Sequence, residues 1–110
     1  MTKPSAPAHL AEPTRKWFLA VIRDYQLEEH HVRLLTLAGE AFDRATQARQ
    51  LIERDGLVVP TGAEGGLKAH PAIAIERDSR LAFARLLREL DLDTDAPSET
   101  RPPALGSNRR

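Results

Sequence analysis

The chain has 110 residues with 16 basic and 16 acidic side chains, so it is long enough for one domain and carries no net charge. Balanced charge excludes a protein that coats nucleic acid by bulk electrostatics. The absence of cysteine excludes disulfides, thiolate metal sites and thiol nucleophiles. No run approaches the roughly 18 apolar residues of a membrane span, and no signal-peptide core is present, so we expect a soluble, cytoplasmic protein.

The first predicted elements are an unstructured arm over residues 1–12 and a helix over residues 13–25. The arm has too few large apolar groups to offset its ordering entropy. Proline suits the first position of the helix. One helical face is apolar and holds Trp17, Phe18, Val21, Ile22 and Tyr25. The opposite face carries Arg15, Lys16 and Arg23. This basic strip fits a phosphate-binding surface or the solvated back of an amphipathic helix.

A long second helix is predicted over residues 28–55, with Gly56 just beyond its C-terminus. Its apolar stripe consists of Leu34, Leu37, Ala38, Ala41, Phe42, Ala45, Ala48 and Ile52. Its polar face consists of Arg33, Glu40, Asp43, Arg44, Gln47 and Arg54. At 1.5 Å per residue the helix is about 40 Å long, and the other two helices are too short to cover the whole stripe. We therefore expect a second copy of the chain to cover part of it.

A small β-hairpin is predicted next, with residues 57–59 paired to residues 67–69, followed by a third helix over residues 71–90. The apolar arc of this helix holds Ile73, Ile75, Ala82, Phe83, Leu86, Leu87 and Leu90. Two arginines fall inside apolar arcs, Arg49 on the second helix and Arg80 on the third. Each has a carboxylate one turn away, Glu53 and Glu76, so either an intrahelical ion pair or a contact across a subunit boundary explains it.

The last segment, residues 93–110, has no apolar periodicity and contains three prolines. An acidic stretch precedes a basic end, which is typical of a disordered tail that either gains order on a partner or has no function. The predicted ordered core and oligomerisation domain is therefore residues 13–92.

Catalytic and metal chemistry find no support in the sequence. The glycine-rich turn lacks the Gly-Lys-Ser/Thr order of a phosphate-binding loop, because Leu67 precedes Lys68 and no hydroxyl residue follows it. His30 and His31 are adjacent and point about 100° apart on a helix, and His70 precedes a proline, which favours a role at the start of the third helix. We expect no enzyme activity, no cofactor and no metal site.

Five short segments occur in a characteristic order: Ala38–Ala45 (AGEAFDRA), Gly56–Val59 (GLVV), Lys68–Pro71 (KAHP), Ile75–Arg77 (IER) and Leu86–Leu92 (LLRELDL). Their order and spacing resemble the small terminase subunit of tailed phages and prophages, specifically the P27-like family. The resemblance covers about residues 17–92. One departure is Asp91, where a glycine-like residue is expected.

The resemblance implies a non-enzymatic protein that assembles into a homo-oligomeric ring and binds double-stranded viral DNA. It would regulate the large subunit, which holds the ATPase and nuclease, so that genome packaging can begin. The basic strip together with the hairpin lysine gives the predicted DNA-binding residues, namely Arg15, Lys16, Arg23 and Lys68. The apolar stripes with their embedded arginines give the predicted oligomer interface, namely Phe42, Ala45, Arg49, Arg80 and Phe83.

Two alternatives belong to other functional classes. One is a small helical protein–protein interaction module without DNA contact, and the other is a DNA-binding regulator without a packaging role. A compact repressor would need a helix-turn-helix, and the second helix is too long and too apolar for a recognition helix. Salt dependence separates DNA binding from apolar association, because phosphate contacts weaken steeply with added salt.

Overall fold

The protein folds into three helices with a two-stranded antiparallel hairpin between the second and third, as the sequence predicts. The computed structural model describes residues 5–62 and 64–92. The predicted C-terminal tail lies outside these residues. The elements are α1 (Glu12–Asp24), α2 (Glu29–Asp55), β1 (Val58–Pro60), β2 (Leu67–Ala69) and α3 (Ala72–Leu90).

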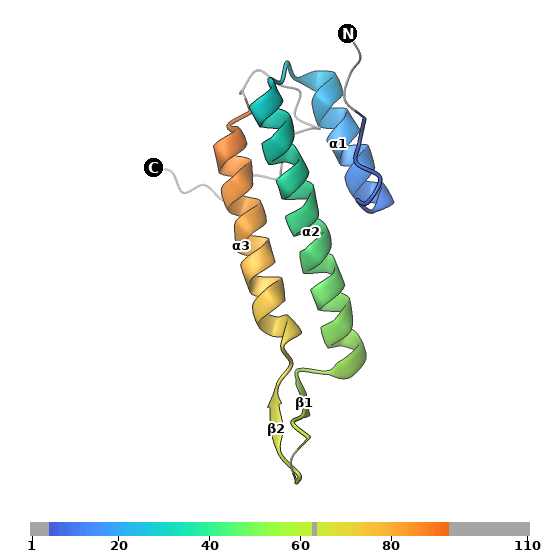
Figure 1. Cartoon of the computed structure of the whole chain (residues 1–110), viewed down its shortest axis with the longest axis vertical. Coiled ribbons are helices and arrows are strands. Elements are labelled where there is room, and N and C mark those ends of the chain that lie inside the picture. Colours follow the sequence, from blue (N-terminus) through green and yellow to red (C-terminus); the bar gives the residue numbers. More distant parts are fainter. Residues whose placement is uncertain (1–4, 63, 93–110) are drawn as a thin grey trace, which may run out of the picture.

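The long helix α2 is the centre of the molecule. α3 runs antiparallel along most of its length, and α1 lies against its first half (Figure 1). Ala38, Ala45 and Ala48 are buried along α2, and their small side chains permit close packing of helices. The hairpin extends beyond the ends of α2 and α3, so the molecule is elongated, with extents of 59 × 40 × 20 Å.

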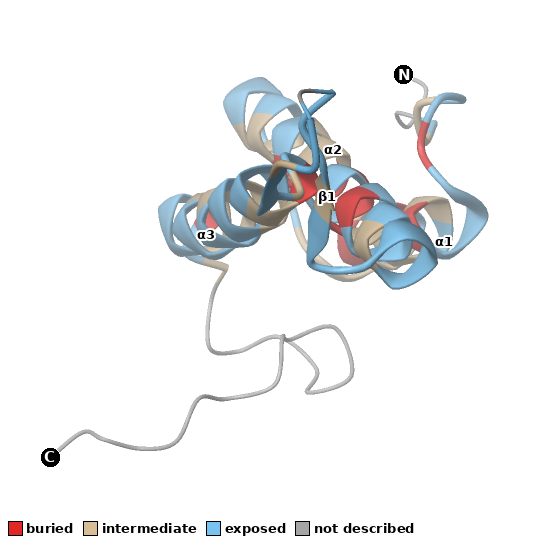
Figure 2. Ribbon diagram, turned by 90° about the horizontal axis from the view of Figure 1, so that it is seen from below, coloured by how far each residue is buried: buried red, intermediate tan, exposed pale blue. Residues whose placement is uncertain are grey.

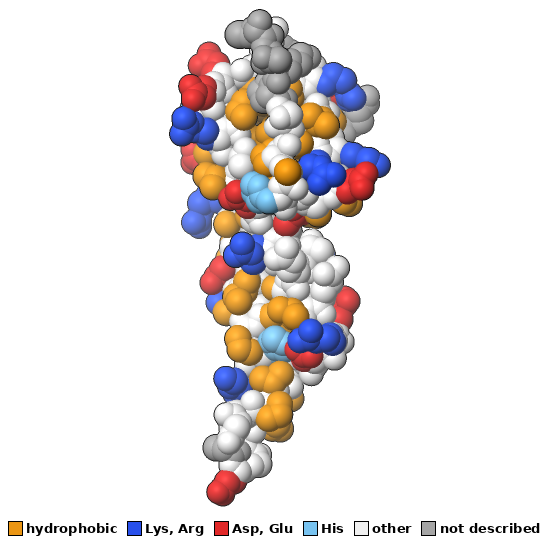
Figure 3. Space-filling view, turned by 45° about the vertical axis from the view of Figure 1, so that its right-hand side comes forward, with side chains coloured by type: hydrophobic (Ala, Val, Ile, Leu, Met, Phe, Trp, Pro, Cys, Tyr) orange, Lys and Arg blue, Asp and Glu red, His pale blue; other side chains and the backbone are white. Residues whose placement is uncertain are grey.

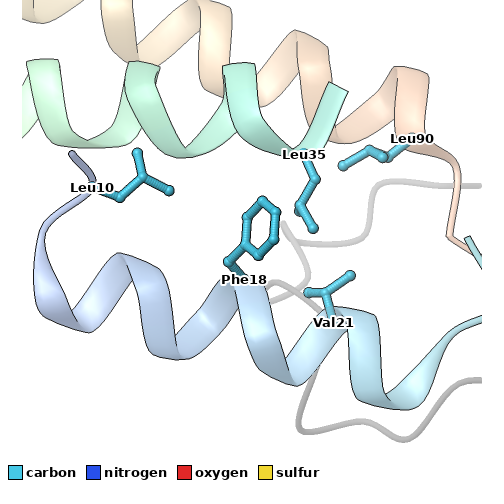
Figure 4. Packing of buried hydrophobic residues seen from close by; sticks show 5 residues of the cluster. All are labelled: Leu10, Phe18, Val21, Leu35 and Leu90. Atoms are coloured by element: carbon cyan, nitrogen blue, oxygen red, sulfur yellow. The ribbon is translucent and has the colours of Figure 1, made fainter. Parts of the chain in front are cut away.

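The hydrophobic core lies where the three helices meet. Its fully buried members point toward one another from the N-terminal segment, α1, α2 and the end of α3 (Figure 4), and they are Leu10, Phe18, Val21, Leu35 and Leu90. The outer faces of the helices are exposed, as Figure 2 shows. The single stripe predicted for α2 is wrong in part. Leu37 and Phe42 are 49% and 44% exposed, whereas Leu35 and Gly39 are buried.

The segment before α1 is part of the core, although the sequence reading assigned residues 1–12 to an unstructured arm. Leu10 is only 2% exposed, and its backbone N–H donates to the carbonyl of Pro7 at 3.3 Å. Gly39 makes room for this segment. A Cβ at that position would lie 3.1 Å from a Leu10 methyl and 3.1 Å from the Thr14 methyl. The ordered region therefore begins before residue 13.

Asp43 is buried, although helical periodicity placed it on the polar face of α2. One carboxylate oxygen accepts from the Thr14 hydroxyl at 2.6 Å, and the other accepts from the Ala11 backbone N–H at 2.7 Å. Ala11 is the N-cap of α1 and has no side chain able to cap the helix. Asp43 supplies that cap from another helix, and its negative charge suits the N-terminal end of the α1 dipole.

The hairpin and the helix ends use the turn residues that the sequence supplies. Gly56 ends α2 with φ of 89°, and Gly62 and Gly65 adopt positive φ in the hairpin turn. Asp91 ends α3 in the left-handed region with φ of 46°, which explains why a glycine is expected there. β1 is Val58–Pro60, one residue later than predicted, and it pairs Val58 with Ala69 and Pro60 with Leu67.

Candidate functional site

The three basic side chains predicted to bind DNA on α1 differ in whether they already bind other groups of the chain. Lys16 is exposed and has no ion-pair partner among the described residues. Arg15 is half-buried and donates to the Leu10 carbonyl at 2.9 Å, so it fastens the N-terminal segment to α1. Arg23 binds Asp24 through two hydrogen bonds of 2.9 and 3.0 Å, and this pairing lowers the pKa of the Asp24 carboxyl. Lys16 is thus the most available cation of the strip.

The fourth predicted DNA-binding residue, Lys68, lies on β2 opposite Val59 and is exposed. α1 and the hairpin are at opposite ends of the molecule (Figure 1). The structure therefore does not bring Lys68 into one patch with the α1 strip. The α1 strip and Lys68 can contact the same DNA molecule in two ways. The DNA lies along the length of one chain, or the two contacts come from different copies of the chain.

Helix α3 carries four arginines, of which two form ion pairs and two form none with a described residue. Arg77 pairs with Asp78 at 3.2 Å, and Arg80 pairs with Glu76 at 3.3 Å. Arg85 and Arg88 make no ion pair with a described residue. The same holds for Arg44 on α2, which the sequence reading placed only on a polar face. Ion pairing depends on side-chain conformation and on neighbouring elements, so the sequence could not separate these free cations from the paired ones.

The predicted interface residues are largely engaged within the chain. Ala45 is 8% exposed. The Phe83 ring lies 5.9 Å from that of Trp17 and 5.3 Å from that of Phe42, so one aromatic cluster joins α1, α2 and α3. Such tilted pairs are worth about 0.5–1.5 kcal/mol beyond their area burial. Phe42 keeps 44% of its surface exposed and remains available to a partner.

Arg49 and Arg80 converge on a single carboxylate. Glu76 is bound by Arg80 within α3 at 3.3 Å and approached by Arg49 from α2 at 3.9 Å. The intrahelical pair of Arg80 is thus confirmed. The predicted ion pair between Arg49 and Glu53 is wrong, because the antiparallel packing of α3 places Glu76 closer to the Arg49 guanidinium.

His70 joins the end of α2 to the start of α3. One imidazole nitrogen, Nδ1, accepts from the Ala72 backbone N–H at 3.0 Å, and Nε2 donates to Asp55 at 2.9 Å. Its backbone N–H donates to the Leu57 carbonyl at 2.8 Å. Arg54 also binds Asp55, and the hydrogen bonds from Arg54 and then from His70 hold the pKa of that carboxyl far below its ordinary 3.8. We name these contacts the Asp55–His70 clasp.

Nothing in the described part of the chain forms a metal-binding cluster of histidine and carboxylate groups. None of the described helices is both long and apolar enough to cross a membrane. The described residues present cations without an ion-pair partner on each helix and on the hairpin, together with exposed apolar side chains. Figure 3 shows hydrophobic side chains at the surface of both halves of the molecule and continuing onto the hairpin.

The sequence from residue 17 to residue 104 matches the family of the phage terminase small subunit. The chain belongs to that family. Comparison with curated proteins and with solved structures gave no match. Membership gives this terminase small subunit a role in phage DNA packaging, in a family whose members are generally not catalytic. The finer assignment to the P27-like group stays a prediction.

The fold gives physical reasons for the short segments of this terminase small subunit. In the Ala38–Ala45 segment, Gly39 admits the N-terminal residues, Glu40 binds His9 at 2.8 Å and Asp43 caps α1. In Lys68–Pro71 the histidine forms the clasp, and in Ile75–Arg77 the glutamate holds two arginines. These segments build the fold, so they do not by themselves indicate where DNA would bind.

Proposed function

We propose that the chain is the small subunit of a viral DNA-packaging terminase, acting in the host-cell cytoplasm. It assembles into a homo-oligomeric ring, binds double-stranded viral DNA and regulates the large subunit that holds the ATPase and nuclease. The observation that carries this proposal is the family match over residues 17–104. The chain itself is not the enzyme.

Free cations support the DNA-binding part of the proposal. Lys16, Arg44, Lys68, Arg85 and Arg88 are exposed and make no ion pair within the described residues. A neutral chain with scattered cations binds DNA weakly, but a ring repeats each cation around an axis. Several phosphates are then contacted at once, and the affinity gains from multivalency. We assign the first DNA contacts to Lys16 and Lys68, with Arg15 and Arg23 contributing beside Lys16.

Exposed apolar side chains support the assembly part. Leu37, Leu51, Leu57, Leu67 and Ile75 are among the large hydrophobic residues left between 38% and 66% exposed. A small domain gains stability when such groups are covered by another copy. Phe42, at 44% exposed, is the apolar member of the predicted interface that remains most open to this role.

Neutralising the free cations tests the proposal. The variant Lys16→Gln/Lys68→Gln should bind duplex DNA several-fold more weakly at low salt, with a smaller dependence of affinity on salt, because fewer counterions are released. The matched control is Arg33→Gln/Arg77→Gln, which removes the same charge from arginines held by Glu29 and Asp78. Equal weakening in both variants would contradict the assignment. Unchanged binding in the first would move the DNA contact to Arg85 and Arg88.

A further inference from the structure

One face of the hairpin is entirely apolar. Alternation along the paired strands places Val58, Pro60, Leu67 and Ala69 on one side, whereas Val59 and Lys68 point to the other. Val58 is 53% exposed and Leu67 is 66% exposed. We call these four residues the hairpin face. It carries no charged side chain, so the surface that covers it must also be apolar.

The hairpin has little support from its own chain. Each strand has three residues, and the described contacts of the hairpin are mainly those between its two strands. A ribbon of this size is marginally stable in water without a surface to pack on. Pairing along the β1 edge is also restricted, because Pro60 has no backbone N–H to donate. Its apolar face is therefore the part best suited to a partner.

The Asp55–His70 clasp holds the hairpin away from α2 and α3, which it connects. His70 hydrogen bonds to Asp55 at the end of α2, to Leu57 before β1 and to Ala72 at the start of α3. The hairpin consequently points beyond the helix ends (Figure 1). It cannot fold back onto exposed apolar residues of the same chain while these contacts hold.

Exposed apolar residues that a hairpin could cover lie on the antiparallel pair of helices α2 and α3. The Phe42–Phe83 and Arg49–Glu76 contacts fix the antiparallel register of α2 against α3, which brings Leu51 level with Ile75. At 100° per residue both lie on the side of the helix pair away from the Arg49–Glu76 contact. Leu51 is 38% exposed and Ile75 is 46% exposed. We call these two residues the helix patch.

We propose that the hairpin face of one copy packs on the helix patch of the next copy. This contact rests on the proposed ring, and it supplies the head-to-tail interface that such a ring requires. One chain displays both uncharged surfaces but cannot bring them together itself, whereas a second copy can. Because the two surfaces differ, the contact is heterologous and repeats from copy to copy until the assembly closes. Lys68, on the opposite side of the hairpin, stays free to contact DNA.

Cysteine cross-linking tests the contact in the full-length chain, which has no native cysteine. Leu67→Cys and Ile75→Cys proteins are mixed and oxidised mildly. A disulfide-linked dimer containing one of each is expected, in large excess over either self-linked dimer. The control mixture pairs Leu67→Cys with Leu19→Cys, whose leucine is also exposed but lies on α1. Equal yields in the two mixtures, or self-linked Leu67→Cys alone, would overturn the contact.

A charge substitution gives a second readout that separates this contact from the ring itself. Leu57 and Leu67 are equally exposed at 66%, but Leu57 belongs to the side of the ribbon that carries Lys68. Leu67→Asp should reduce the mass measured by light scattering to that of smaller species, with helix content unchanged, and Leu57→Asp should retain the wild-type mass. An assembled wild type with an equally assembled Leu67→Asp variant overturns the contact alone. A monomeric wild type overturns both the contact and the proposed ring.

Discussion

At the scale of single residues, Asp43 shows how a charged side chain is used inside this small fold. Its carboxylate is nearly buried, and both oxygens accept hydrogen bonds from the first turn of α1. The sequence could not reveal this, because caps are recognised from neighbouring residues and Asp43 lies 32 positions from the N-terminal N–H that it binds. Periodicity alone placed it with the solvated residues of α2.

Removing the charge of Asp43 should destabilise the protein. In Asp43→Asn one of the two charged acceptor oxygens becomes an amide N–H₂, so the charge-assisted hydrogen bonds to Ala11 and Thr14 are replaced by weaker neutral ones and the negative charge at the start of α1 is lost, at a cost of about 1–3 kcal/mol. Urea denaturation followed by circular dichroism measures the change. The control Asp78→Asn alters an exposed aspartate on α3 and should cost less than about 0.5 kcal/mol. Equal effects would show that the cap contributes nothing special.

The lowered pKa of Asp55 should make the stability of the folded protein fall as the pH is lowered. Its pKa in the folded protein is lowered by Arg54 and by His70, so the stabilisation is fully present above the ordinary value of 3.8. It is lost progressively as pH falls below 3.8 toward the folded pKa. The melting temperature of the wild type should therefore exceed that of Asp55→Asn at about pH 5, and the gap should narrow on acidification. A gap that widens would contradict this sign.

At the scale of elements, the helices were predictable and the segment before α1 was not. Strong apolar periodicity placed all three helices within one residue of their observed ends. Leu10 gave no signal, because it stands alone among small residues and prolines. Its burial depends on Gly39 of α2, a tertiary contact that no local pattern contains. The one-residue shift of β1 has a larger consequence than the shifts at the helix ends. It moves each β1 side chain to the opposite face of the hairpin from the one that the predicted pairing gave it.

The N-terminal segment should contribute measurably to stability. Leu10→Ala removes a side chain that is 2% exposed and leaves a cavity against α2, so a loss of about 2–5 kcal/mol is expected. Leu19→Ala on α1 is the matched control, since Leu19 is 46% exposed. Chemical denaturation of both variants decides the matter. A Leu10→Ala variant as stable as the control would mean that the segment does not pack on the core in solution.

At the scale of the whole molecule, the proposed assembly would account for both the exposed apolar groups and the balanced charge. The sequence correctly indicated a surplus of apolar surface on α2, but it misjudged which residues carry it. Ala45 and Phe83 are engaged within the chain, whereas Leu51, Leu67 and Ile75 are exposed. The free cations were only partly predictable, because the pairing of Arg49 with Glu76 depends on how α3 packs on α2, whereas Arg23 pairs with the adjacent Asp24.

Self-association should depend on Phe42. Its ring packs on Phe83 but remains 44% exposed, so a charge there opposes both the aromatic cluster and any partner that covers it. Phe42→Glu should lower the oligomer mass in light scattering, or unfold the chain, whereas Arg44→Glu, two positions away and exposed, should do neither. A Phe42→Glu protein with wild-type mass and wild-type helix content would remove Phe42 from the interface.

We propose that this terminase small subunit binds viral DNA as an assembly of many weakly basic copies. The most direct measurement is the affinity of the intact wild-type oligomer for duplex DNA over a series of salt concentrations. We predict binding that weakens steeply with salt, with a log–log slope that corresponds to several phosphates per assembly. An intact oligomer with no affinity for DNA at low salt, or with an affinity independent of salt, would contradict DNA binding through phosphate contacts.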